Sequence, residues 1–205
     1  MQKRRLFIAI PLSESAARSV KKIVNELERK FEHFSDTKIR FMPRENWHIT
    51  VSFLGSQNDI MLPAITSAIK KVSYAFEPPE IVFEKIDYGP LSPKRSDDSI
   101  SPRSKEAKMI WLHTDQATSE SIGKIKGALE DELAMHAVPF QREARTFSGH
   151  ITLARFPEGH QQATLPNIEK TLQFSFSAPS IDLMESNLVK SGAEYNILQV
   201  TPFKE

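Results

Sequence analysis

Cysteine is absent from the 205-residue chain, and this absence excludes several classes of site at once. Without thiols there is no disulfide framework, no thiolate nucleophile and no cysteine-bound zinc or iron–sulfur centre. Glycine is also scarce, at seven residues, and forms neither a Walker loop nor a dinucleotide-binding fingerprint. A His-Glu-x-x-His pattern typical of zinc hydrolases is missing as well. These absences favour chemistry carried by acid–base side chains.

Long apolar runs and an excess of charge of one sign are missing too. No stretch approaches the roughly 20 apolar residues that cross a bilayer. The apolar run Leu6–Ile10 follows basic residues but ends at Pro11, too short for a signal peptide. We therefore expect a cytoplasmic monomer that does not bind membranes. The net charge of +1 predicts no wrapping of long nucleic acid, although an enzyme that binds only a terminal nucleotide needs no basic excess.

Apolar periodicity divides the chain into predicted helices and strands. The predicted helices are 13–31, 59–74 and 116–135. The predicted strands are 6–10, 47–54 (ended by Gly55), 81–88, 109–112, 147–156, 174–176, 181–189 and 195–200. Prolines and mixed charges over 90–108 predict a long mobile loop or insertion, whose basic residues contact RNA or, more commonly for such stretches, are only solvated.

The order of these elements repeats within the chain. A strand, a helix and a strand containing His-Ile-Thr occur in residues 6–54 and again in residues 109–156. This repetition indicates two related halves. Helices between antiparallel-type strands predict an α+β fold.

Two segments of the predicted strands carry the residues of chemical interest: Trp47-His48-Ile49-Thr50-Val51 and Gly149-His150-Ile151-Thr152-Leu153. Residues two apart in a strand share a face, so each segment presents an imidazole and a hydroxyl opposite an apolar face. The apolar face of the first strand is predicted to hold Trp47, Ile49, Val51 and Phe53, with Ser52 on the side of the histidine.

Two such His/Thr pairs facing one another suit cleavage of a phosphodiester without a metal. A neutral histidine accepts a proton from water, and a protonated one supplies a proton to the leaving oxygen. The threonine hydroxyls can bind the non-bridging oxygens and stabilise the developing charge. His48 and His150 are therefore the predicted catalytic pair, and neither a metal nor a cofactor is expected.

A single His-x-Thr is weak evidence, because most such histidines pack in the core or lie at the surface. Two copies with matching flanks and matching upstream elements favour catalysis. The other histidines share no such context and are interpreted as structural or exposed: His33, His113, His136 and His160. A mononuclear His/Asp metal site stays open as an alternative, although no ligand spacing recommends it.

On these motifs the chain resembles the two-histidine (2H) phosphoesterase superfamily, whose signature is a pair of His-x-Thr/Ser motifs. It looks most like the bacterial and archaeal RNA 2′,3′-cyclic phosphodiesterases, also called 2′-5′ RNA ligases. The resemblance spans nearly the whole chain and rests on residues 5–10, 43–50, 53–55 and 150–155. It implies a bilobal α+β fold, with two pseudo-symmetric lobes of antiparallel sheet plus helices around a central cleft, in one domain over residues 1–205.

The resemblance also implies a reaction in which water opens a terminal 2′,3′-cyclic phosphate, expels the 3′ oxygen and leaves a 2′-phosphate. In that reaction His150 is the general base on water and His48 the general acid on the 3′ oxygen. Thr50 and Thr152 hold phosphate oxygens, and Arg155 binds the phosphate as a bidentate donor. The implied partner is an RNA 3′ end or a nucleotide with a 2′,3′-cyclic phosphate. Ligation of that end to a 5′-hydroxyl is the reverse chemistry at the same site.

Two positions depart from the family pattern. Gly149 stands where members often have proline. Strict alternation points Arg155 away from His150, so contact with the phosphate requires a twist, a bulge or a strand end near Ala154. Other functions stay open: cleavage of 2′-5′ linkages, cleavage of a small cyclic nucleotide metabolite, and non-catalytic binding of RNA ends.

Overall fold

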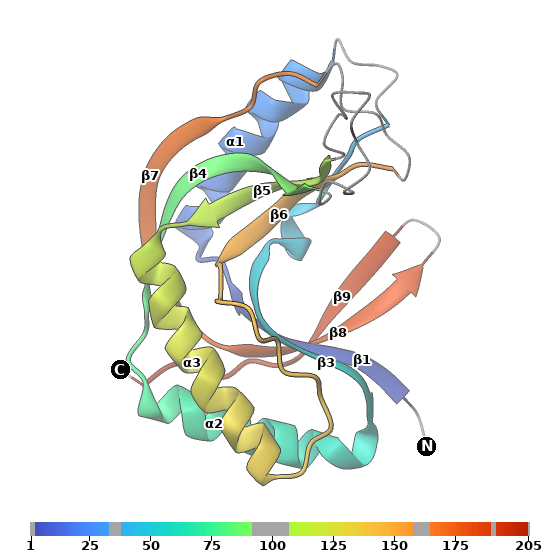
Figure 1. The fold of residues 1–205 in the computed structure, drawn as a ribbon, viewed down its shortest axis with the longest axis vertical. Helices are drawn as coiled ribbons and strands as arrows, with labels where there is room; N and C mark the ends of the chain where they lie inside the picture. Colours follow the sequence, from blue (N-terminus) through green and yellow to red (C-terminus); the bar gives the residue numbers. More distant parts are fainter. Residues whose placement is uncertain (1–2, 33–37, 92–106, 158–164, 190–191, 205) are drawn as a thin grey trace, which may run out of the picture.

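A computed structural model describes residues 3–32, 38–91, 107–157, 165–189 and 192–204 of the chain. These residues form two antiparallel sheets and three α-helices, which confirms the predicted α+β class (Figure 1). Sheet A has the strand order β3-β1-β8-β9, with the bounds His48–Asn58, Lys3–Pro11, Asp182–Val189 and Gly192–Gln199. Sheet B has the order β2-β6-β5-β4-β7, with the bounds Arg40–Phe41, His150–Arg155, Ala107–Thr114, Glu80–Leu91 and Lys170–Ser177. The loop predicted over 90–108 falls largely outside the described residues.

The helices are α1 (Glu14–Phe31), α2 (Leu62–Ala75) and α3 (Gln116–Met135), and short 3₁₀ turns η1 (Arg44–Asn46) and η2 (Asp59–Met61) precede β3 and α2. Helices α1 and α3 begin where the sequence predicts, whereas α2 begins three residues after its predicted start. The Ser13 hydroxyl accepts a hydrogen bond from the Ala16 amide at 3.2 Å, and the Asp115 carboxylate accepts one from the Thr118 amide at 2.8 Å. Each cap satisfies an amide that the first turn leaves unpaired.

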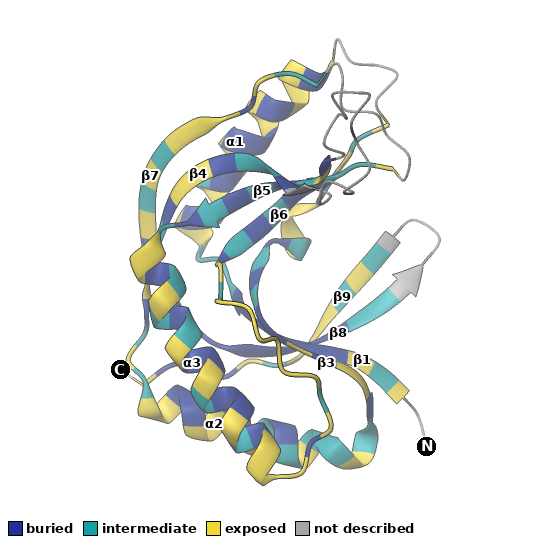
Figure 2. Cartoon of the chain, viewed as in Figure 1, coloured by how far each residue is buried: buried dark blue, intermediate teal, exposed yellow. Residues whose placement is uncertain are grey.

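Each strand–helix–strand unit packs its helix against the other sheet. Helix α1 connects β1 to β3 of sheet A but packs on β7 of sheet B, where Lys170 pairs with Glu26 at 2.7 Å. Helix α3 connects β5 to β6 of sheet B but packs on β3, where the Ser52 hydroxyl donates to Glu130 at 3.3 Å. Figure 2 shows the buried residues of these helices on the sides that meet the sheets. We propose that this exchange makes residues 1–205 a single domain.

Several strands differ from the prediction at their ends, and one strand was missed. Strand β3 does not end at Gly55 but continues to Asn58, with Gly55 at a φ of 68°, where residues without a Cβ are favoured. Strand β2 was not predicted, because its two residues are too few to display a period. It pairs with the end of β6 and closes that edge of sheet B.

Candidate active site

A bulge in β3 changes which residues share the face of His48. Thr50 is paired with Ala9 and Ser52 with Ile8, so that Val51 is an extra residue between them. An extra residue reverses the alternation of every side chain beyond it. Ser52 is therefore buried, and Phe53, which is 60% exposed, lies on the same face as His48 and Thr50. The prediction that placed Phe53 in the core and Ser52 beside the histidine was wrong.

The same bulge occurs at the equivalent position of β6. Thr152 is paired with Trp111 and Ala154 with Ile110, which leaves Leu153 as the extra residue. Leu153 and Ala154 are both fully buried, and Arg155 returns to the face of His150 and Thr152. Because of this bulge, Arg155 and His150 lie on the same side of the strand.

The two histidine-bearing faces meet. We call the face of sheet A with His48, Thr50 and Phe53 the histidine face of sheet A, and that with His150 and Arg155 the histidine face of sheet B. Strand β3 lies against β6, although the two belong to different sheets (Figure 1). The charges of Arg155 and of protonated His150 both lower the pKa of His48, so the three groups lie within electrostatic range of one another.

Aromatic rings enclose His48. Its ring centroid lies 5.0 Å from that of Phe7 and 5.1 Å from that of Tyr195, which meets the imidazole edge-on. Burial lowers the pKa of His48 to about 4, the Asn46 carbonyl opposes this shift, and the charges of Arg155 and His150 add to it. Within the described residues its Nδ1 makes no hydrogen bond of standard geometry. The ligand-free site therefore holds His48 neutral at pH 7.

His150 is held more firmly than His48. Its Nδ1 lies 2.9 Å from the Ser148 carbonyl oxygen, and its ring centroid lies 4.4 Å from that of Trp111. A carbonyl only accepts, so Nδ1 carries the proton and Nε2 of the neutral ring keeps its lone pair. Burial lowers the pKa of His150, while the Ser148 carbonyl opposes the shift. These contacts fix an imidazole that is ready to accept a proton through Nε2.

The packing around Gly149 leaves no room for a Cβ atom. A Cβ there would lie 2.4 Å from the Thr114 hydroxyl oxygen, and the Gly149 amide donates to the Ser119 hydroxyl at 3.0 Å. Proline, common at this position in the family, offers no amide hydrogen. At this position, hydrogen bonds of the Gly149 backbone, and not a proline ring, therefore hold the start of β6.

One neighbour of the site was missed from the sequence. His113, interpreted as structural or exposed, lies directly opposite His150 in the β5–β6 register, and their ring centroids are 6.1 Å apart. Burial is the main cause that lowers the pKa of His113 to about 4. Sequence spacing gives no signal for this contact, because the register of β5 against β6 is set by long-range pairing. Of the remaining histidines, His136 is exposed, while 33 and 160 lie outside the described residues.

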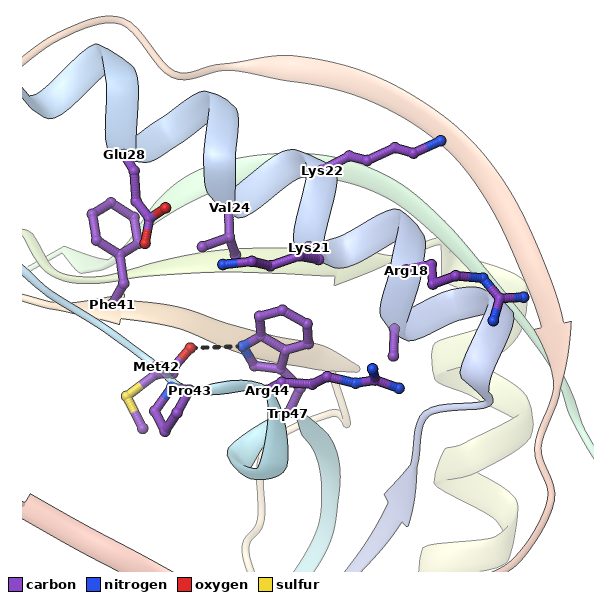
Figure 3. Close-up of a pocket in the computed structure, with 11 residues that line it drawn as sticks. Arg18, Lys21, Lys22, Val24, Glu28, Phe41, Met42, Pro43, Arg44 and Trp47 are labelled. Carbon is purple, nitrogen blue, oxygen red and sulfur yellow. Dashed lines mark hydrogen bonds between the residues drawn. The ribbon is translucent and has the colours of Figure 1, made fainter.

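A hollow of about 540 Å³ lies between α1 and residues 41–47 (Figure 3). Trp47 forms part of its wall, and the indole Nε1 donates to the Met42 carbonyl at 3.0 Å. Basic side chains border it, among them Lys21 and Arg44. None of the predicted catalytic or phosphate-binding residues lines this hollow, so it is separate from the histidine faces.

Among the described residues, no three His, Asp or Glu side chains are grouped closely enough to hold a metal ion. None of the helices in the described part of the chain is long and apolar enough to cross a membrane.

This chain is similar to a known protein family, to two archaeal enzymes and to a solved structure. The family model described as LigT like Phosphoesterase matches residues 10–96. RNA 2′,3′-cyclic phosphodiesterase of Methanothermobacter thermautotrophicus is 22% identical, over 97% of this chain and 98% of its own length. The enzyme of the same description from Methanocaldococcus jannaschii is 25% identical, over 95% and 98%. The crystal structure of E. coli LigT complexed with 3′-AMP superposes with a TM-score of 0.66 at 20% identity, over the whole of both chains.

The model match covers the first histidine motif, and the relatives extend the similarity across both. The fold, with its two antiparallel sheets and three described helices, is LigT-like. The chain therefore has a LigT-like fold and is similar to the LigT-like phosphoesterases, with RNA 2′,3′-cyclic phosphodiesterases among its relatives over nearly the full length.

Proposed function

We propose that this protein is a metal-independent RNA 2′,3′-cyclic phosphodiesterase that converts a terminal 2′,3′-cyclic phosphate to a 2′-phosphate. The observation that carries the proposal is the meeting of two His/Thr pairs from different sheets, with Arg155 in electrostatic range of His48. The phosphodiesterase names of the two archaeal relatives support the substrate class. The complex of E. coli LigT with 3′-AMP supports binding of a nucleotide.

The state of His150 suits the general base. With Nδ1 bonded to the Ser148 carbonyl, Nε2 accepts the proton of a water molecule as its oxygen adds to phosphorus. The bond from phosphorus to the 3′ oxygen breaks, and the 2′ oxygen keeps the phosphate. The base therefore ends the step protonated and one water molecule is consumed.

His48 supplies the proton that the departing 3′ oxygen takes up. Its pKa of about 4 disfavours that proton in the empty site, mainly through burial and partly through the charge of Arg155. A bound phosphate anion offsets the charge of Arg155 and favours protonated His48. Substrate binding and charging of the general acid are thus coupled.

Different residues are candidates for binding the phosphate and the base of the substrate. Thr50 and Thr152 are partly buried on the two histidine faces, where their hydroxyls can donate to non-bridging oxygens. The Arg155 guanidinium suits bidentate binding of the phosphate. Phe53 is exposed on the face of His48 and offers an aromatic surface for stacking on the terminal base.

The test uses a short RNA that ends in a 2′,3′-cyclic phosphate, incubated in EDTA, with the product ends separated chromatographically. We expect a 2′-phosphate that the wild-type protein forms and that His48→Ala and His150→Ala do not. His136→Ala is the matched control, because His136 is an exposed histidine at the end of α3.

Other outcomes point elsewhere. A 3′-phosphate product would contradict the roles of the two histidines, and activity that EDTA removes and a divalent metal restores would contradict the metal-free reaction. An untouched cyclic end would favour 2′-5′ linkages or small cyclic nucleotides as substrates. Joining of the cyclic end to an added 5′-hydroxyl RNA would reveal the reverse, ligase reaction. Binding without any turnover would favour an RNA-end binding module.

A further inference from the structure

Sheet B extends the row of His150 by two polar side chains that the proposed reaction does not use. Lys85 of β4 is paired with His113 of β5, and His113 is paired with His150 of β6. Residues directly opposite one another in antiparallel strands point to the same face. Lys85, His113 and His150 therefore form one row across three strands.

The neighbouring row indicates which face this is. Ile86, Leu112 and Ile151 are paired in the same way, and none is more than 3% exposed. They occupy the core face of sheet B. Since Lys85 directly precedes Ile86 and alternates with it, Lys85 lies on the histidine face, where its side chain is exposed.

His113 brings an uncharged polar ring to this row. Trp111 meets the ring edge-on at 5.6 Å, and among the described residues no hydrogen bond to the ring is found. Burial, then the charges of His150 and Lys85, lower the pKa of His113. The Lys85 ammonium is thus close enough to act on the ring, and the neutral ring retains a donor for a ligand.

Lys85 is a cation without an ion-pair partner among the described residues. Arg145, which also acts on His150, already pairs with Glu143 at 3.1 Å, whereas Lys85 makes no ion pair with a described residue. Asp87 faces the same side two residues further along β4, where its carboxylate accepts the Tyr88 amide at 2.6 Å and its charge opposes the lowering of the His113 pKa. A free ammonium beside a neutral donor suits an anionic oxygen of phosphate.

We propose that Lys85 and His113 bind the phosphate on the 5′ side of the terminal nucleotide, so that the enzyme prefers substrates that carry one. This inference rests on the proposed function and extends it from the reacting group to the adjoining nucleotide. The 6.1 Å between the His113 and His150 rings is comparable with the step between neighbouring phosphates of an extended single strand. Lys85 lies one strand further, about 4.8 Å beyond His113 in the direction across the sheet.

The experiment compares kcat/KM for substrates that differ only at that phosphate. One pair is 2′,3′-cyclic AMP with and without a 5′-phosphate. The other is a cyclic-ended dinucleotide with a normal or an uncharged methylphosphonate linkage. We expect the wild-type protein to prefer the charged member of each pair by about tenfold, the value of one hydrogen bond to a charged group. Lys85→Ala should reduce that preference to about twofold or less, and Lys85→Arg should keep it.

Two variants sharpen the result. Lys170→Ala is the matched control, because Lys170 lies on the same sheet but pairs with Glu26 of α1, and it should keep the preference. His113→Leu should weaken the preference more than His113→Gln, whose amide still donates. The slope of log(kcat/KM) against log[salt] should be steeper for the charged substrates by about 0.7 in the wild-type protein and not in Lys85→Ala.

If Lys85→Ala lowers kcat/KM equally for the charged and the uncharged substrates, the preference is unchanged and the proposal is overturned. If the wild-type protein opens no cyclic phosphate, the proposed function fails separately. The preference is then measured as the ratio of Kd values for 2′-AMP with and without a 5′-phosphate. A ratio that Lys85→Ala does not change would overturn the subsite on its own.

Discussion

Strands β3 and β6 share the sequence His-Ile-Thr and the same bulge after threonine, yet they give the two sheets different chemistry. The residue that the bulge returns to the histidine face is Phe53 in β3 and Arg155 in β6. Around Phe53 the face of sheet A is aromatic, with Phe7 and Tyr195, while the face of sheet B carries Arg155 at one end of β6 and Lys85 in the row of His150 at the other end. In the function we propose, the same bulge therefore places a residue for the base on sheet A and a residue for the phosphate on sheet B.

The histidines differ in the same way. His150 has an Nδ1 contact to the Ser148 carbonyl at 2.9 Å, whereas Nδ1 of His48 lacks a described hydrogen bond and the ring sits between Phe7 and Tyr195. A neutral imidazole whose Nδ1 proton is bound to a carbonyl suits a general base, because Nε2 keeps its lone pair. An imidazole that is protonated when an anion binds suits a general acid. In the mechanism we propose, the two halves therefore divide the proton transfers as well as the substrate.

The largest expected effect comes from replacing either histidine. His48→Ala and His150→Ala should each lower kcat by about a hundredfold to ten-thousandfold. In the wild-type protein, kcat/KM should follow a bell whose optimum lies below pH 6.5, because both histidines have lowered pKa values in the free site. His150→Ala should remove the limb at lower pH and His48→Ala the limb at higher pH. Loss of the same limb in both variants would contradict the assignment.

Arg155 should matter next most. Arg155→Met should lower kcat/KM by about a hundredfold, since it removes a charged donor from the phosphate. Arg155→Lys should recover part of this loss, because the charge returns without the bidentate geometry. Steady-state kinetics on the cyclic-ended RNA measure both. Exchange of Arg142, whose ion pair with Asp131 lies on the surface, is the control and should change little.

Phe53 should have a smaller effect that falls on binding. Phe53→Ala should raise KM by about tenfold with little change in kcat, since stacking on a base contributes about 1–3 kcal/mol. Phe53→Trp should keep KM low. Tyr74, an exposed aromatic residue on α2, provides the control Tyr74→Ala. A substrate whose terminal base is absent should be indifferent to Phe53→Ala, and a KM rise with that substrate would contradict stacking.

A separate expected effect concerns stability and not turnover. His48 and His113 have pKa values of about 4 when folded against 6.5 for the ordinary side chain, chiefly because of burial. The unfolded chain therefore binds protons that the folded chain does not, and stability falls as pH falls from about 6.5 towards 4. Urea unfolding should register a loss on the order of 5 kcal/mol for the pair. His113→Leu should flatten this dependence, and an unchanged slope would mean that His113 is charged in the folded protein.

Local sequence determined much of the framework. The cap Ser13 marked the start of α1 and the apolar spacing marked that of α3, since a helix is held by contacts within a few residues. The pairs His48/Thr50 and His150/Thr152 also followed from the two-residue period of a strand. Both inferences depend only on neighbours in the chain.

Tertiary structure decided what stands beside those pairs. The bulges at Val51 and Leu153 exist because β1 and β5 impose their register, and they reverse the faces that alternation assigned to Phe53 and Arg155. The exchange of α1 and α3 between sheets, and the row that joins Lys85 to His150, likewise depend on residues distant in the sequence. The sequence by itself thus determined the acid–base groups, and long-range strand pairing decided which side chains surround them, because register is a property of two strands and not of one.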